Sequence, residues 1–395
     1  MYPKWRYNPF VKKLSAVFLG GLVALLLLEI GIRVKENRFF TFENAFDLEM
    51  EKGVGRAVTD PDPQLGFRLK SNYKTIQDHF VFPHNRYKIR FSEVSTTPER
   101  FRSSPNTYGI KLRKDYGPIL TLGDSFTFGA EVNDNETWPS HLQNFSKTTV
   151  LNGGVVGFGL DQTYLLFEEL ITQNNFKPSW VIISLTPLNI ERTHLKGRFK
   201  YLTGEFVPRP FLEIEDFKIK QIHYPDALAY KQQYMYRYTR LDPVRRILGY
   251  SFAIDSIFKE IAPKWWWNMH DEKKTAKEFR TPHKSDEVSQ VIIKKISELA
   301  KEKGFKLLIV RQDFFQRSFE YQTDLAQERV VAWCKEQGLL VVDLHPKLKQ
   351  LFYENTEKYR SFFLPPHMTN QGNLFVAQEI WNQINQSGDF SADSH

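Results

Sequence analysis

Residues 118–129, PILTLGDSFTFG, give the clearest local indication of the fold. The first half of this stretch is a short apolar run typical of a buried strand, and its second half is a turn with a serine between two glycines. A serine at such a strand-to-helix turn exposes its hydroxyl beside backbone N–H groups, which suits a nucleophile whose oxyanion those amides could bind. Ser125 could instead only cap the following helix.

The chain after residue 118 alternates short apolar runs with helix-like stretches. This alternation predicts an α/β fold in which helices cover both faces of a parallel sheet. Reactive side chains then gather at the carboxyl ends of the strands. The expected strands are 118–122, 149–151, 180–185, 306–310 and 339–344, and the expected helices lie near 134–145, 160–174, 287–303, 324–337 and 371–385.

Glycines and polar residues follow the other expected strands. The second strand ends in NGGVVGFG (152–159), which permits close backbone approach but has neither a dinucleotide-binding spacing nor a phosphate-loop ending. The third ends in SLTPLNI (184–190), where the Asn189 amide could donate to an oxyanion. Near the C-terminus, PPHMTNQG (365–372) places His367 just before the last helix.

Three supporting residues in these turns are expected to act on the backbone. Asp124 is expected to fix the serine turn by hydrogen bonding, and Asn152 to anchor the geometry of the second loop. Gly154 is expected to be needed for backbone conformation.

These four blocks, in this order between residues 118 and 385, resemble the SGNH hydrolase superfamily, also called GDSL-like lipases and esterases. The resemblance implies a flavodoxin-like three-layer α/β/α sandwich with a parallel sheet. It implies that Ser125 is the nucleophile and His367 the general base. It further implies an oxyanion hole made by the Ser125 and Gly157 amides and the Asn189 side chain. The chain also looks like membrane-anchored bacterial members with a short β-rich lead-in.

Two positions depart from the family pattern. The third block usually reads Gly-x-Asn-Asp, whereas Asn189 here lies between two apolar residues. The aspartate usually found three residues before the histidine is replaced by Leu364, and Pro365 offers no carboxylate either. Loss of the group that orients the histidine costs a serine hydrolase about 10⁴-fold. A backbone carbonyl or a distant carboxylate such as Asp343 replaces it, or the enzyme is slow or inactive; Asp343 could equally be a cap or turn residue after its strand.

Residues 14–32, LSAVFLGGLVALLLLEIGI, form an apolar segment with a single charge, Glu29. A helix of this length covers roughly 28 Å, close to the hydrocarbon thickness of a bilayer. We expect an uncleaved, single-pass anchor, because a signal peptide has a shorter apolar region that ends in small residues, whereas this one continues into Arg33 and Lys35. A cleaved signal peptide and a buried helix are the alternatives. The leader 1–13 is expected to stay in the cytoplasm, which puts the rest of the chain on the periplasmic or extracytoplasmic side of the cytoplasmic (inner) membrane.

The remaining chain is predicted to fall into three parts. Residues 40–117 form a small β-rich lead-in, residues 118–386 the SGNH-like domain, and residues 387–395 a tail. Within the domain, residues 195–285 are an aromatic-rich insertion. Its tyrosines and tryptophans could pack a small core of their own, or could form a surface that stacks on sugars or rests on a membrane.

Composition narrows the possible partners. Of the 395 residues, 41% are hydrophobic and 25% are charged, which excludes a disordered or low-complexity chain. The single cysteine, Cys334, excludes an internal disulfide and a cysteine-rich zinc site, and the sequence has no HExxH pair or acidic cluster that indicates a metal. We expect no cofactor. The net charge of +8 is dispersed, and together with the anchor it argues against a nucleic-acid partner.

The sequence therefore predicts a membrane-anchored serine acyl-ester hydrolase of the esterase or deacetylase type. Its expected partners are the lipid bilayer, through residues 14–32, and an acylated envelope or exported glycan, or a lipid, as substrate. Two alternatives stay open. One is an O-acyltransferase on the same substrates; the other is a catalytically degenerate member that serves as an envelope binding or assembly subunit.

Overall fold

The computed structural model describes residues 9–35, 58–81, 88–105, 109, 111–113, 116–173, 176–199, 206–215, 218–221, 244, 247–262, 281, 283–316, 325–364 and 367–386. The tyrosines and tryptophans singled out in the insertion, and the tail 387–395, lie outside these residues. The chain divides into two compact units. The smaller comprises Met1–Gly53, Phe199–Val207 and Tyr230–Lys277, and the larger comprises Val54–Arg198, Pro208–Ala229 and Glu278–His395.

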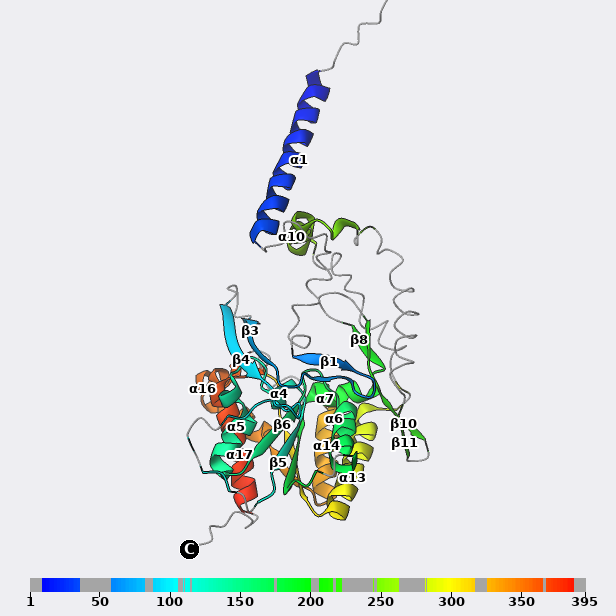
Figure 1. Cartoon of the computed structure of the whole chain (residues 1–395), viewed down its shortest axis with the longest axis vertical. Coiled ribbons are helices and arrows are strands. Elements are labelled where there is room, and N and C mark those ends of the chain that lie inside the picture. The colour runs from blue at the N-terminus through cyan, green and yellow to red at the C-terminus, as the bar shows by residue number, and fades with distance from the viewer. Residues whose placement is uncertain are drawn as a thin grey trace, which may run out of the picture. The chain divides into compact units, whose positions relative to one another are not determined.

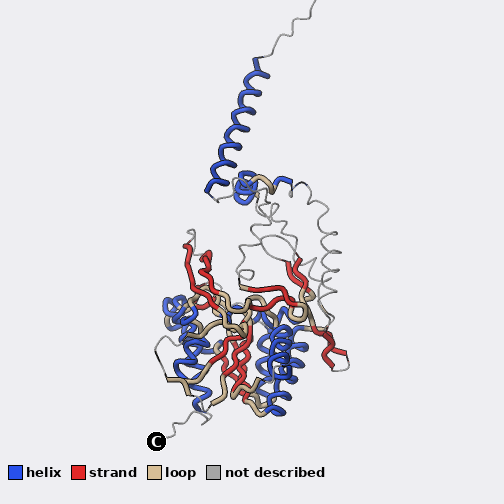
Figure 2. Tube along the Cα trace, viewed as in Figure 1, coloured by secondary structure: helices blue, strands red, loops and turns tan. Residues whose placement is uncertain are grey.

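A five-stranded sheet, parallel throughout, forms the centre of the larger unit (Figure 2). All five strands predicted from the apolar runs are present, with small shifts at their ends. In spatial order they are β13 (Leu340–Asp343), β12 (Lys306–Arg311), β7 (Trp180–Leu185), β5 (Ile119–Gly123) and β6 (Val150–Gly154).

Helices cover both faces of this sheet, as Figure 1 shows. Successive side chains of a strand point to opposite faces, so along β7 Trp180 and Ile182 join one apolar cluster and Val181 and Ile183 join the other. These clusters are completed by helices on the two faces, and the result is the three-layer α/β/α architecture. The first cluster includes α5 (Trp138–Ser146) and α17 (Asn370–Gln386), and the second includes α6 (Leu160–Glu168), α13 (Ser285–Lys303) and α14 (Leu325–Glu336).

The segment ahead of the sheet forms two antiparallel hairpins. β1 (Thr59–Asp62) pairs with β2 (Gly66–Leu69), and β3 (Lys74–Val81) pairs with β4 (Lys88–Ser95). A turn of π-helix, Glu169–Gln173, extends α6 ahead of the insertion. The described part of the insertion contains four further short strands. The short strands are β8 (Gly197–Phe199), β9 (Phe206–Pro208), β10 (Leu212–Glu215) and β11 (Lys218–Gln221).

The last part of the chain contains helices that the sequence did not predict. After β13 the chain forms α15 (His345–Glu354) and α16 (Thr356–Ser361). A small antiparallel pair, β14 (Phe363–Leu364) and β15 (His367–Met368), then leads into α17. This pair fixes the position of His367 just before the final helix.

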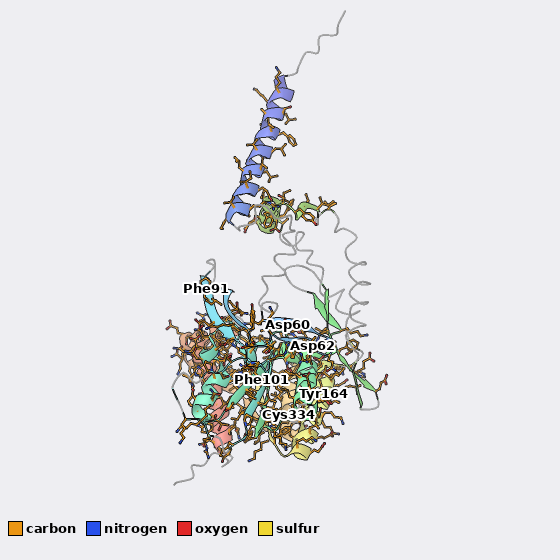
Figure 3. The ribbon with its side chains drawn as sticks, in the orientation of Figure 1. Asp60, Asp62, Phe91, Phe101, Tyr164 and Cys334 are labelled. Atoms are coloured by element: carbon orange, nitrogen blue, oxygen red, sulfur yellow. The ribbon has the colours of Figure 1, made fainter. Side chains whose placement is uncertain are left out.

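Cys334 lies in the core of the larger unit, where Figure 3 labels it. Its side chain is on α14 and is fully buried. Burial raises the pKa of the Cys334 thiol to about 12, because the thiolate is poorly solvated there. The thiol therefore stays protonated and inert near neutral pH.

The N-terminal segment forms one continuous helix, α1 (Pro9–Lys35). Residues Lys12–Lys35 are long and apolar enough to cross a membrane, with a mean hydropathy of 2.3 in the most apolar part. Its apolar side chains are exposed on all sides rather than buried in the protein (Figure 3). The helix thus has the length and surface of a membrane span.

Candidate active site

Ser125 stands at the junction between β5 and the short helix α4 (Ser125–Phe128). Asp124 caps this helix, since its side chain accepts a hydrogen bond from the Phe126 amide at 3.0 Å. Gly129 ends the helix in the left-handed conformation, with φ of 78°. The helix is therefore held to one turn at the carboxyl end of the strand, with Ser125 as its first residue.

The structure brings His367 to this serine from a position 242 residues further along the chain. The His367 Nε2 atom lies 2.8 Å from the Ser125 Oγ atom. The imidazole also packs on the Phe126 ring, with 5.1 Å between ring centroids. The two residues therefore share one site, in the contact that a general base needs to take the serine proton.

The other nitrogen of the imidazole faces a carboxylate that the sequence did not point to. Glu131 Oε1 lies 3.2 Å from His367 Nδ1. Both side chains are mostly buried, with 14% of Glu131 and 17% of His367 exposed. A carboxylate in this position holds the histidine in one tautomer and stabilises the imidazolium that forms when the serine is deprotonated. Ser125, His367 and Glu131 thus form a continuous chain of contacts.

The carboxylate beside His367 is a distant one, as one of the sequence alternatives allowed, but it is neither next to the histidine in sequence nor Asp343. Leu364 lies opposite His367 in the β14–β15 pair and supplies no carboxylate, and Pro365 is outside the described residues. Asp343, the proposed distant substitute, accepts hydrogen bonds from Lys335 Nζ at 2.9 Å and from the amide of His345 at 3.3 Å. Asp343 is the last residue of β13, and its bond to the His345 amide fits the cap or turn residue given as the alternative.

Arg102 holds the loop that carries Glu131. Its guanidinium is fully buried and donates to the carbonyls of Phe128 (2.9 Å) and Val132 (2.6 Å), while Nε donates to Asp134 at 3.0 Å. Burial lowers the pKa of Arg102, and the neighbouring Asp134 carboxylate opposes that shift. Glu131 itself has a φ of 71°, an unusual backbone conformation for a residue other than glycine. The bonds on both sides of Glu131 hold the loop in this conformation.

An Arg102→Met substitution is expected to lower the free energy of unfolding by about 3–5 kcal/mol, because it removes the donor to the buried Val132 carbonyl and the cationic partner of Asp134. Urea denaturation of the purified chain measures this loss. The control is Arg100→Met, whose guanidinium pairs with Asp60 near the surface and whose loss should cost less than about 1 kcal/mol. Equal effects of the two substitutions would contradict the role given to Arg102.

The glycines of the second block bring backbone close to the serine helix. A Cβ atom on Gly154 would lie 2.2 Å from the Phe128 nitrogen, so only glycine lets the end of β6 approach α4 this closely. Asn152 accepts a hydrogen bond from the Gly154 amide at 3.0 Å and donates to the Phe128 carbonyl at 3.4 Å. Both residues act on the backbone beside the serine helix.

Gly157 lies in the turn after β6, and Asn189 lies in a short helix that contacts this turn. Gly157 has a φ of 88° in a turn that is closed by a 3.1 Å bond from the Phe158 amide to the Val155 carbonyl. Asn189 is fully buried in α7 (Pro187–Glu191), and its Nδ2 lies 3.5 Å from the Phe158 carbonyl. The Asn189 amide is thus directed at the residue next to Gly157 and supports this loop.

Asp124 links the serine turn to the third block. Its Oδ2 atom accepts a 2.7 Å hydrogen bond from the Thr186 hydroxyl, and Arg192 lies 3.4 Å from the same oxygen. Arg192 also donates to the Phe158 carbonyl at 2.9 Å. Burial lowers the pKa of the Arg192 guanidinium, but an arginine remains protonated. Asp124 therefore belongs to a hydrogen-bond network that extends from the serine turn to the residue next to Gly157.

The parallel sheet lies between two helical layers, and Ser125 and His367, from the first and last of the four sequence blocks, meet beside it. No family model matches the chain. No curated protein matches it either. Similar solved structures include an acetylxylan esterase from Geobacillus stearothermophilus, 13% identical, which covers 69% of this chain and 96% of its own with a TM-score of 0.38. Another is a member of the lipolytic G-D-S-L family from Veillonella parvula DSM 2008, 13% identical, covering 67% and 96% with a TM-score of 0.36.

Proposed function

We propose that this chain is a serine esterase that cleaves acyl esters through a covalent acyl-enzyme. The observation that carries the proposal is the chain of contacts from Ser125 Oγ to His367 Nε2 (2.8 Å) and from His367 Nδ1 to Glu131 Oε1 (3.2 Å). Such a chain supplies a nucleophile, a base within hydrogen-bond reach and a group that orients the base. The glutamate also removes the main reason for regarding the chain as a degenerate, noncatalytic member.

The reaction would run in two halves. His367 Nε2 takes the Ser125 proton while Oγ bonds to the ester carbonyl carbon, and the imidazolium then gives that proton to the departing alcohol. In the second half, His367 takes a proton from water, whose oxygen bonds to the acyl carbon. The bond from that carbon to Ser125 Oγ then breaks, the imidazolium returns its proton to Oγ, and a carboxylic acid leaves. Glu131 accepts a hydrogen bond from Nδ1–H in both halves.

We assign the oxyanion in this reaction to three donors. The Ser125 amide is at the start of α4, where a helix leaves N–H groups without internal partners, and the Gly157 amide lies in the adjoining turn. The third donor is Asn189 Nδ2, which would exchange its long bond to the Phe158 carbonyl for a bond to the oxyanion. Preorganised donors of this kind act where the negative charge develops.

An Asn189→Ala substitution is expected to lower kcat by about 10²- to 10³-fold with little change in KM, because it removes a bond that is made only in the transition state. Steady-state hydrolysis of p-nitrophenyl acetate measures the two constants. A loss confined to stability, with kcat unchanged in the folded fraction, would instead limit Asn189 to supporting the Phe158 carbonyl.

The proposal places this chemistry at a membrane and outside the cytoplasm. Helix α1 has the length and apolar surface of a membrane span. Acylated glycans of the envelope, or exported ones, are then the esters within reach of an anchored domain. Lipid esters are the other substrates at that surface.

A fluorophosphonate probe tests the proposal directly. We expect one probe per chain, attached to Ser125, when the full chain is labelled in detergent micelles and mapped by mass spectrometry. The Ser125→Ala variant should take up none, whereas Ser71→Ala, which removes an exposed hydroxyl bonded to the Pro98 carbonyl, should label normally. Failure of the folded chain to label at high probe concentration would favour a noncatalytic binding or assembly subunit.

The fate of the acyl group separates an esterase from an acyltransferase. An esterase releases one acetate per p-nitrophenol whether or not a glycan fragment is added. With a transferase, less free acetate would be released per p-nitrophenol once the fragment is added. The missing acetyl groups would be found on the fragment by mass spectrometry.

A further inference from the structure

The single charge in the apolar span has a defined set of partners inside the smaller unit. Glu29 Oε1 accepts a bond from Arg33 Nε at 2.6 Å. Its Oε2 accepts bonds from the Ser251 hydroxyl and the Ala253 amide, both at 2.8 Å. Ser251 is the N-cap of α10 (Phe252–Ile261). A carboxylate is costly in an apolar span, and here it is offset by a cation and by the start of another helix.

Arg33 makes a second connection to the same segment. Its NH2 group donates to the Tyr250 carbonyl at 2.8 Å, and its guanidinium lies 4.7 Å from the centre of the Phe252 ring. Figure 1 shows α10 crossing the lower end of α1. The end of α1 therefore holds a helix that is more than 200 residues away in the sequence.

Helix α10 is amphipathic, and the far end of its apolar side is exposed. Residues 254, 257, 258 and 261 are isoleucine or phenylalanine at i, i+3, i+4 and i+7, which places them on one side of the helix. Ile257 is 38% exposed and Ile261 71% exposed. Just before α10, Ile247 is 70% exposed. Near the start of the helix, in contrast, Phe252 and Ala253 are buried.

We propose that α10 is an interfacial helix that lies in the headgroup region of the same membrane that α1 spans. This inference rests on the membrane anchor proposed above. The bilayer covers the apolar side of α10 because the two helices contact each other at this point: the start of α10 is bonded to Glu29 and Arg33, near the end of the apolar surface of α1. The last turn of α1 carries Arg33 and Lys35, the basic residues that mark the water-facing end of a span. An amphipathic helix attached at that depth buries its apolar side at the boundary of acyl chains and headgroups.

The same contacts bear on whether α1 is retained. Cleavage after α1, as for a signal peptide, would remove Glu29 and Arg33 and leave the start of α10 without its carboxylate partner. An uncleaved α1 would therefore have two roles. It positions α10, and so the membrane-facing side of the smaller unit, as well as anchoring the chain.

The test measures the depth of single labelled positions in the full chain in liposomes. Cys334 is buried, with its pKa raised to about 12, so a cysteine introduced at the surface is labelled selectively. The variants Ile257→Cys, Ile261→Cys and, as the exposed control on the polar side, Glu260→Cys carry the fluorophore NBD. We expect labels at 257 and 261 to be quenched by spin-labelled lipid and to react with aqueous dithionite about fivefold more slowly than the label at 260.

A second substitution ties the depth to the α1 contact. In a chain that carries Glu29→Ala, the label at position 261 should lose most of its protection from dithionite. The same chain should still resist extraction by alkaline carbonate. Equal dithionite rates at 257, 260 and 261 in a chain that resists carbonate would overturn the interfacial helix and leave the anchor standing. Loss of the whole chain into the carbonate supernatant would refute the anchor itself. Protection without lipid quenching, together with disulfide cross-linking between copies of the Ile261→Cys variant, would assign this side of α10 to a second copy and overturn the proposal.

Discussion

Replacing Ser125 with alanine is expected to lower kcat for p-nitrophenyl acetate by about 10⁵- to 10⁶-fold, to a rate near that of a site with no nucleophile. The reason is chemical: alanine cannot form the bond to the acyl carbon, and the His367 base then has no hydroxyl to activate. The structure should tolerate the change, because the contacts that shape the serine turn are made by the backbone of residue 125 and by the Asp124 cap rather than by the hydroxyl. A burst of p-nitrophenol equal to the enzyme concentration should disappear at the same time.

The His367→Ala variant should lose about as much activity as Ser125→Ala, and the double variant should lose no more than either. Nonadditivity follows because base and nucleophile act as one unit across the 2.8 Å contact. The matched control is His283→Ala, a half-buried histidine outside this contact, which should keep kcat within about twofold. Losses that multiply in the double variant would mean that the two residues work independently, and the shared mechanism would then be wrong.

The sheet could be predicted from the sequence because buried parallel strands appear as nearly continuous apolar runs. Trp180–Leu185 shows this most clearly, since every residue of that strand is buried. α15 and α16 could not be predicted in this way. α16 buries only Tyr359 and has no apolar stripe. α15 does carry a helical stripe, in which Leu348, Leu351 and Phe352 face the core, but this signal is periodic rather than a continuous apolar run.

The serine and the turn residues stood out in the sequence because they lie in local motifs at strand ends, and His367 stood out in a motif just before the last helix. Glu131, the carboxylate beside His367, could not be predicted, because it lies in no sequence motif that indicates a catalytic residue. Its place is fixed by Arg102, which comes from a segment ahead of the sheet and bonds to the loop on either side of the glutamate. Only a survey of all carboxylates that follow the strands' carboxyl ends would have included Glu131, six positions after the serine.

Replacing Glu131 with glutamine is expected to lower kcat by about 10³- to 10⁴-fold while leaving KM close to the wild-type value. Glutamine keeps the size of the side chain and removes its charge, so the imidazolium formed during attack is no longer stabilised. An amide can also donate to Nδ1, which would favour the tautomer in which Nε2 carries the proton and cannot accept it from serine. The fluorophosphonate labelling rate should fall in parallel, because that reaction also begins with activation of the serine.

Three further substitutions separate orientation of the base from support of the loop. Asp343→Asn removes the carboxylate that the sequence suggested, and because Asp343 bonds to Lys335 rather than to His367, it should change kcat by less than about threefold. Glu131→Asp keeps the charge on a shorter side chain and should retain more activity than Glu131→Gln. Leu364→Asp, added to Glu131→Gln, offers a carboxylate at the position that the SGNH pattern uses, three residues before the histidine. Partial recovery there would show that the site needs a carboxylate on the histidine and not a glutamate in the loop. Wild-type kcat in folded Glu131→Gln would refute the assignment and leave the 3.2 Å contact without a catalytic role.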